Sequence, residues 1–126
     1  MRSYDDARKL IGQKMEASTT NGRTRWIKFE ENTDGSVAVV MFHTEIVTFY
    51  PEHLDVQTEG FVTPSTFDGI ATALGVSRIC VGTVKREPFL FGHRMSEGMR
   101  LDYAGAVISG GRELTPMTLP RKRTSA

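Results

Sequence analysis

One short segment with a well-marked start and end constrains the fold of this chain more than any other. Pro64 is favoured in the first turn of a helix, where its missing N–H needs no partner, and Thr63 before it can cap the free amides. Gly75 suits the left-handed conformation in which many helices end. The segment predicts a helix over 63–74, packed on a sheet through an apolar stripe at helical spacing: Phe67, Ile70, Ala71 and Leu74.

Antiparallel strands are predicted before this helix. Residues 25–30 alternate in polarity, which is typical of a strand, and 32–36 are rich in turn-forming Asn, Asp and Gly. A second strand is expected over 37–49, and its continuous apolar start suggests that both faces are covered. Pro51 then breaks the pattern, and a third strand is predicted over 54–61. The middle of the chain therefore predicts a three-stranded meander.

A hairpin is predicted after the helix. Its strands are 77–84 and 89–91, and residues 85–88 form the turn between them. Residues 99–103 can form a last edge strand. Together these elements predict the α+β class: an antiparallel sheet made of a meander and a hairpin, with one helix packed on it.

The two ends of the chain have different patterns. Residues 3–17 show helical spacing and predict an N-terminal helix, followed by a turn-rich break at 18–23. At 126 residues the chain fits one domain, expected over 1–109. Residues 110–126 contain Gly and Pro and little periodicity, which predicts an extended C-terminal arm. We expect three apolar side chains to anchor this arm on a partner: Leu114, Met117 and Leu119.

A common core follows from the strand alternation and the helical stripe. Nine side chains are expected to be largely buried together: Ile27, Ala38, Val40, Ile46, Phe61, Phe67, Ile70, Leu74 and Ile79.

The sequence does not specify catalysis, a metal site or a cofactor. Cys80 is the single cysteine and lies in an apolar run, where a thiol is usually structural. The three histidines, at 43, 53 and 93, have no spacing typical of metal ligands. We therefore expect no catalytic residue, no metal and no cofactor, and we expect the chain not to be an enzyme. The N-terminus lacks the apolar region of a signal peptide, and no run is long enough to span a membrane.

Two basic clusters are candidates for contact with a macromolecular partner or with nucleic acid. The net charge of +1 is too balanced to imply nucleic-acid binding from bulk electrostatics. Cationic side chains beside an aromatic ring can nevertheless contact phosphates and stack on a base. The first cluster is Arg23, Arg25 and Lys28 beside Trp26, and the second is Arg121, Lys122 and Arg123.

Residues 37–92 resemble a group of small, mostly uncharacterised tailed-phage proteins. Those proteins have a strand containing His-Gly-Thr-x-Ile-Val, and a second strand that ends in Gly-Gly-Trp-x-Thr-x-Thr-Thr directly before a helix with a buried Ile. The matching residues here are Thr44, Ile46, Val47, Gly60, Thr63, Thr66 and Ile70, with Ser65 as a close substitute. The chain departs from the pattern at Phe42, His43, Glu59, Phe61 and Ala71, where the group has His, Gly, Gly, Trp and Asn. The resemblance implies a phage origin and a compact α+β unit, and it implies no activity.

These observations favour a non-enzymatic phage-type protein that binds a macromolecular partner, such as a host or defence protein. Two alternatives remain open: a structural component of the virion or its assembly, and a nucleic-acid-binding accessory protein. A protein partner is expected, nucleic acid or a second copy of the chain could also be bound, and no membrane is expected as a partner. The expected location is the host cytoplasm or the virion.

Overall fold

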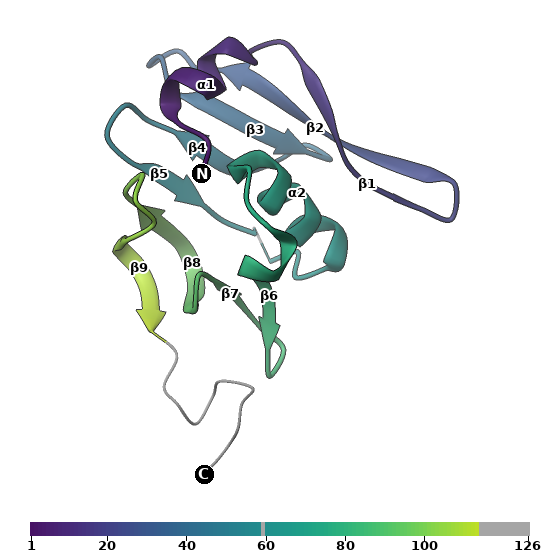
Figure 1. The fold of residues 1–126 in the computed structure, drawn as a ribbon, viewed down its shortest axis with the longest axis vertical. Helices are drawn as coiled ribbons and strands as arrows, with labels where there is room; N and C mark the ends of the chain where they lie inside the picture. Colours follow the sequence, from purple (N-terminus) through teal and green to yellow (C-terminus); the bar gives the residue numbers. More distant parts are fainter. Residues whose placement is uncertain (59, 114–126) are drawn as a thin grey trace.

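The chain folds into an α+β structure with one antiparallel sheet (Figure 1). The computed structural model describes residues 1–58 and 60–113. In these residues the strand order is β1-β2-β3-β4-β5-β8-β7-β6, and β9 pairs with β8. The elements are α1 (Tyr4–Lys9), β1 (Lys14–Thr20), β2 (Arg23–Glu31), β3 (Val37–Met41), β4 (Thr44–Phe49), β5 (Leu54–Val56), α2 (Pro64–Leu74), the 3₁₀ helix η1 (Arg78–Cys80), β6 (Val81–Val84), β7 (Glu87–Leu90), β8 (His93–Leu101) and β9 (Val107–Glu113).

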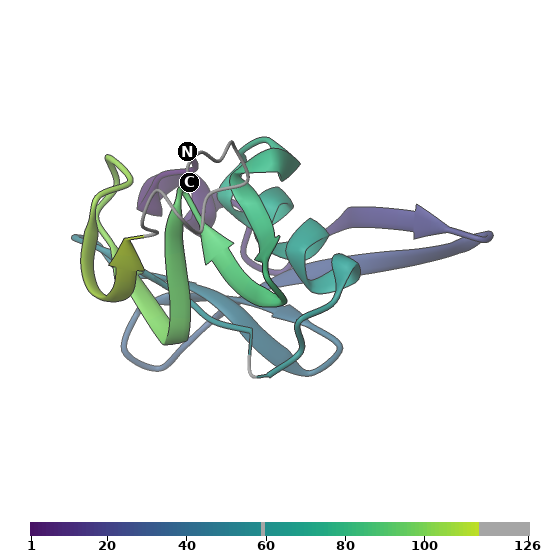
Figure 2. The same ribbon diagram turned by 90° about the horizontal axis from the view of Figure 1, so that it is seen from below.

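Helix α2 fills the inner side of a curved sheet. It contacts β1 and β2 at one end of the strand order and β6 at the other, so the sheet must curve around it. Both helices lie on the same side of β3 and β4 (Figures 1 and 2). The helix approaches the sheet closely at Gly69, where a Cβ atom would lie 2.9 Å from Met41 Sδ and 3.0 Å from Ile46 Cδ1. A glycine at this position lets the helix pack almost directly against the strands.

The predicted common core is confirmed at five of the nine positions: Ile27, Ile46, Phe67, Ile70 and Leu74. Ala38 is buried as well, but it pairs with Glu30 on the outer face of β3, away from this core. Val40 is partly buried on the outer face of β3. Two predictions are wrong, because Phe61 and Ile79 are exposed. Strand β5 ends at Val56, so Phe61 lies in the loop before α2, and Ile79 lies in η1 instead of in a strand.

Tight hairpin turns join most neighbouring strands. In the described residues four of these turns have two residues, both with positive φ, which is the type I′ geometry that matches the twist of the strands. The four are Asn21-Gly22, Phe42-His43, Lys85-Arg86 and Phe91-Gly92. Phe42-His43 reverses the chain between β3 and β4, so the single strand predicted over 37–49 is two strands.

The N-terminal helix is much shorter than predicted. Helix α1 ends at Lys9, and residues 14–20 form β1 instead of continuing the helix over 3–17. Gly12 has a φ of 86° and interrupts the helical path. The segment 18–23 is not a break, because only Asn21 and Gly22 form the turn between β1 and β2. The resulting hairpin projects from the body of the molecule (Figures 1 and 2). With it, the meander runs from β1 to β5.

The last third of the chain adds to the sheet. The predicted hairpin is present as β6 and β7. Its turn is only Lys85-Arg86, because Glu87 and Pro88 of the predicted turn belong to β7, and residues 78–80 form η1 instead of the start of the first strand. Strand β8 is longer than the edge strand predicted over 99–103, and it pairs with β5, β7 and β9. Strand β9 continues through the first residues of the predicted arm at 110. The predicted arm anchors Leu114, Met117 and Leu119 lie outside the described residues.

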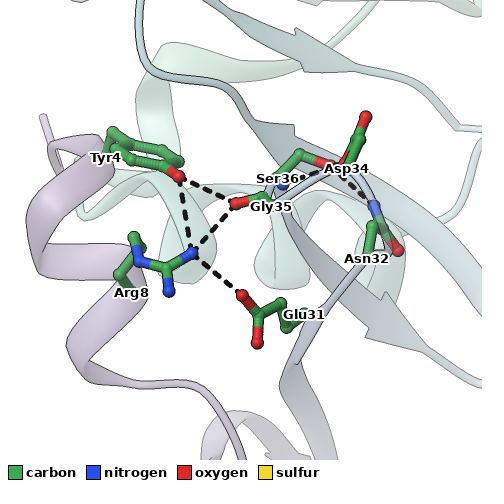
Figure 3. A network of polar contacts seen from close by, with 7 residues as sticks. All are labelled: Tyr4, Arg8, Glu31, Asn32, Asp34, Gly35 and Ser36. Atoms are coloured by element: carbon green, nitrogen blue, oxygen red, sulfur yellow. Dashed lines mark hydrogen bonds and ion pairs between the residues drawn. The ribbon is translucent and has the colours of Figure 1, made fainter.

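A polar network fastens α1 to the turn between β2 and β3 (Figure 3). The Tyr4 hydroxyl donates to the Gly35 carbonyl at 2.8 Å, and Arg8 Nη1 donates to the same carbonyl at 3.0 Å and to Glu31 Oε2 at 3.2 Å. Within the turn the hydroxyl and the backbone N–H of Ser36 donate to the Asp34 carboxylate, and these bonds lower the pKa of Asp34. The stability that they contribute is present above the ordinary Asp pKa and is lost as the pH falls through the lowered value.

Arg2 ties the N-terminus to the other end of α2. Its guanidinium donates to the carbonyls of Ala73 at 2.8 Å and Thr72 at 3.0 Å, and its backbone N–H donates to Leu74 O at 2.6 Å. These carbonyls belong to the last turn of the helix, where a cation also interacts favourably with the helix dipole. The first residues of the chain therefore fix the carboxyl end of α2.

The packing of α2 can be tested with two isoleucines that the sequence alone does not distinguish. Ile70→Ala should lower the free energy of unfolding by about 2–5 kcal/mol, because Ile70 is fully buried between α2 and the sheet. Ile79→Ala should change it by less than about 0.5 kcal/mol, because Ile79 is 83% exposed. Urea unfolding of both variants measures the difference. Equal losses would show that α2 does not pack on the sheet as described.

Candidate functional site

The main candidate site is a hollow of about 340 Å³ where the amino-terminal end of α2 meets the turn between β3 and β4. Most of its lining is apolar. The lining residues come from β2, β3, β4, the turn between β3 and β4, the loop before α2, and α2: Arg25, Met41, Phe42, Thr44, Ile46, Phe61, Thr63, Ser65 and Thr66. Three stretches that are distant in the sequence, at residue 25, over 41–46 and over 61–66, therefore build one concave surface.

The floor and the rim of this hollow differ in exposure. Met41 and Ile46 form the floor and are almost completely buried. Phe42 and Phe61 belong to the rim and are 64% and 57% exposed. Val62, next to Phe61, is exposed as well. Exposed aromatic side chains beside a concave apolar surface are typical of binding sites.

The amino-terminal end of α2 forms one wall of the hollow. Thr63 is the N-cap and accepts a hydrogen bond from Thr66 N at 3.3 Å, and Pro64 is the first helical residue, as predicted. The hydroxyls of Thr63 and Thr66 lie 3.1 Å apart. The predicted left-handed cap is also confirmed, because Gly75 has a φ of 72°. The primary role of the Thr63 and Thr66 hydroxyls is therefore to cap the helix.

Arg25 is the one cationic side chain in the lining. Side chains two residues apart in a strand point to the same face, so Arg25 shares the inner face of β2 with the buried Ile27, whereas Trp26 points outward. Its Nη1 atom is buried and has no hydrogen-bond partner among the described residues. A buried guanidinium nitrogen without a partner is destabilising, because it has lost its hydration without gaining an acceptor.

The turn that carries Phe42 has an unfavourable sequence for its geometry. Phe42 and His43 have φ values of 53° and 75°, and both central residues of a type I′ turn strongly prefer Asn, Asp or Gly. A left-handed conformation costs a residue with a Cβ atom roughly 1–2 kcal/mol. The chain therefore holds an exposed phenylalanine in a strained conformation at the edge of the hollow. Strain of this kind is concentrated at functional sites.

The structure divides the first predicted basic cluster between the two faces of β2. Arg25 faces inward, whereas Trp26 and Lys28 lie on the outer face, where Lys28 forms an ion pair with Glu30 at 3.6 Å. Arg23 lies beside the hairpin turn and does not line the hollow. The second cluster, Arg121, Lys122 and Arg123, lies outside the described residues. Contact of either cluster with nucleic acid stays a prediction.

A second depression, of about 370 Å³, lies on the outer face of the sheet and is mostly polar. Thr48, Asp55, Arg100 and Ser109 are neighbours across β4, β5, β8 and β9 and form a polar row along it. Arg100 donates to both oxygens of Asp55, at 2.8 and 3.1 Å, and this hydrogen bonding raises the pKa of Arg100. The central charges of this row satisfy each other, which leaves the hollow at α2 as the stronger candidate.

The sequence missed Phe42 and Phe61 as site residues. Both were expected in strands, and Phe61 in the core, because large apolar residues are usually buried. The signal for Phe42 was indirect: the tailed-phage pattern has His-Gly at positions 42 and 43, and a glycine there is compatible with a turn. Cys80 was expected within a strand and instead lies in η1, partly buried.

No group of three or more His, Cys, Asp or Glu side chains in residues 1–58 and 60–113 is placed to hold a metal ion. None of the helices in this part of the chain is long and apolar enough to cross a bilayer. Comparisons of the chain with protein-family models, with curated proteins and with solved structures give no match.

The N-cap of α2 can be tested by mutation. Thr63→Ala should lower the free energy of unfolding by about 1 kcal/mol, because it removes the acceptor for Thr66 N. Ser65 lies two residues further along in the same wall of the hollow, and Ser65→Ala should change the free energy of unfolding by less than about 0.5 kcal/mol. Thermal unfolding of both variants provides the comparison. A loss at Ser65 that matches the loss at Thr63 would contradict the assigned cap.

The strain at Phe42 can be tested by giving its turn a favourable sequence. The double variant Phe42→Asn with His43→Gly should raise the free energy of unfolding by about 1 kcal/mol, since Asn-Gly suits both positions. Lys85→Asn with Arg86→Gly makes the same change in the turn between β6 and β7, which has the same geometry, and should stabilise by a similar amount. Chemical denaturation measures both. A destabilised first variant would show that Phe42 is required for folding.

Proposed function

We propose that this chain is a non-enzymatic phage-type protein that binds a macromolecular partner, for example a host or defence protein, through the aromatic rim of the hollow. The observation that carries the proposal is Phe42, which is 64% exposed and held in a left-handed conformation. Solvation and backbone geometry both disfavour phenylalanine at this position. Folding therefore gives no reason for the residue, whereas binding does.

The surroundings of Phe42 support a protein partner. Phe61 and Val62 extend the exposed apolar surface beside the hollow. Aromatic side chains are enriched at protein–protein interfaces, where a few of them supply most of the binding free energy. The phage origin rests on the resemblance of residues 37–92 to the tailed-phage group. We place the protein in the host cytoplasm or in the virion on the same ground.

The two turn variants also test this function. The tagged full chain serves as bait in a lysate of cells that naturally contain it, and mass spectrometry compares the recovered proteins. We expect the native chain and the Lys85→Asn/Arg86→Gly variant to recover the same partner. The Phe42→Asn/His43→Gly variant should lose it although its fold is more stable.

The comparison separates binding from folding, because both variants carry the same turn chemistry. Recovery of the same partner by all three proteins would contradict a role for Phe42. Loss of the partner by both variants would mean that turn strain itself matters, and that the rim does not carry the interaction.

A further inference from the structure

We propose that the hollow receives an apolar side chain of the protein partner together with an adjoining carboxylate, which Arg25 binds. This inference rests on the proposed function and deepens it, because it assigns the chemistry of the group that enters the site. The carboxylate could be the C-terminus of the partner or the side chain of an Asp or Glu next to the apolar residue.

The shape of the hollow suits one side chain. A volume of about 340 Å³ lies at the small end of ligand pockets, which commonly measure roughly 300–1,000 Å³. The floor offers Met41, whose flexible thioether adapts to apolar groups and makes favourable contacts with aromatic rings. Phe42 and Phe61 can then cover an inserted aromatic or aliphatic group from the rim.

Arg25 gives the hollow a positive charge. Arg25 lines the site, and its buried Nη1 atom has no hydrogen-bond partner among the described residues. Asp68, on the first half of α2, is already engaged by Arg78 at 2.8 Å. A ligand carboxylate in the hollow would neutralise the charge of Arg25, and guanidinium–carboxylate pairs are among the stronger hydrogen-bonded contacts. The nearby amino-terminal end of α2 also favours a negative charge through its dipole.

The apolar lining decides which anion fits. A bare inorganic anion would leave the surfaces of Met41, Ile46 and the two phenylalanines uncovered, whereas an apolar group with a carboxylate satisfies both parts of the site. The test therefore uses 3-phenylpropanoate, its neutral analogue 3-phenylpropanamide and inorganic phosphate. Each is titrated into the full chain while NMR follows the amide signals of Thr44, Ser65 and Thr66.

The carboxylate probe should give saturable shifts at these amides, and the amide analogue should bind about tenfold more weakly or worse. Phosphate should give no saturable shift. Two short peptides then identify the source of the carboxylate: one ends in Phe with a free C-terminus, and the other carries Phe-Asp with an amidated end. Equal binding of the carboxylate and the amide, or tighter binding of phosphate, would overturn the proposal.

A pair of arginine variants supplies the control. Arg25→Gln should weaken carboxylate binding by about tenfold, whereas Arg23→Gln, with the same change of charge on the same strand, should leave it unchanged. Arg25→Lys keeps the charge but not the planar guanidinium, so its affinity for the carboxylate probe should lie between those of the native chain and the Arg25→Gln variant. Thermal unfolding checks that each variant is folded. Equal weakening by the Arg23 and Arg25 variants would show a general charge effect and overturn the assignment.

The same variants separate this inference from the proposed function. If Arg25→Gln still recovers the partner from lysate and Phe42→Asn/His43→Gly does not, then the partner binds through the rim, and the inference that Arg25 binds its carboxylate is wrong. If both Phe42 and Arg25 variants recover the partner, the proposed function itself fails.

Discussion

The structure depends on the fit of one eleven-residue helix into a curved sheet. Helix α2 lies against strands from both ends of the strand order, and the absence of a side chain at Gly69 allows its close approach to Met41 and Ile46. Thr63 caps its amino-terminal end, and Arg2 binds the carbonyls of its carboxyl-terminal end. Both ends of the helix are therefore fixed, and the hollow at its amino-terminal end inherits a defined geometry.

The candidate site follows from this arrangement. Met41 and Ile46, which touch Gly69 in the core, also form the floor of the hollow, so core packing and site shape are coupled. The tight turn after Met41 places Phe42 at the rim in a conformation that its side chain disfavours. Natural proteins commonly accept such a loss of stability where a binding surface requires it. The rim, the floor and Arg25 thus form one surface whose features folding alone does not explain.

The sequence predicts those parts of the fold that have local signals. Thr63, Pro64 and Gly75 fix both ends of α2, and the apolar stripe identifies its buried face. Local signals fail where tertiary pairing decides the structure: the predicted helix over 3–17 gives way to β1, which pairs with β2. The turn at Phe42-His43 has no Asn or Gly to reveal it, and its strain is what makes it informative. The hollow was not predictable, because it needs three distant stretches of the chain to come together.

The surface around Phe42 is proposed to contact a partner in the cell. Photo-crosslinking measures this directly, with p-benzoylphenylalanine placed at position 42 or, as a control, at position 85 in the turn between β6 and β7, which has the same geometry. A specific crosslinked species is expected from position 42 and none from position 85. A chain that crosslinks equally from both positions, or only from position 85, would contradict this proposal.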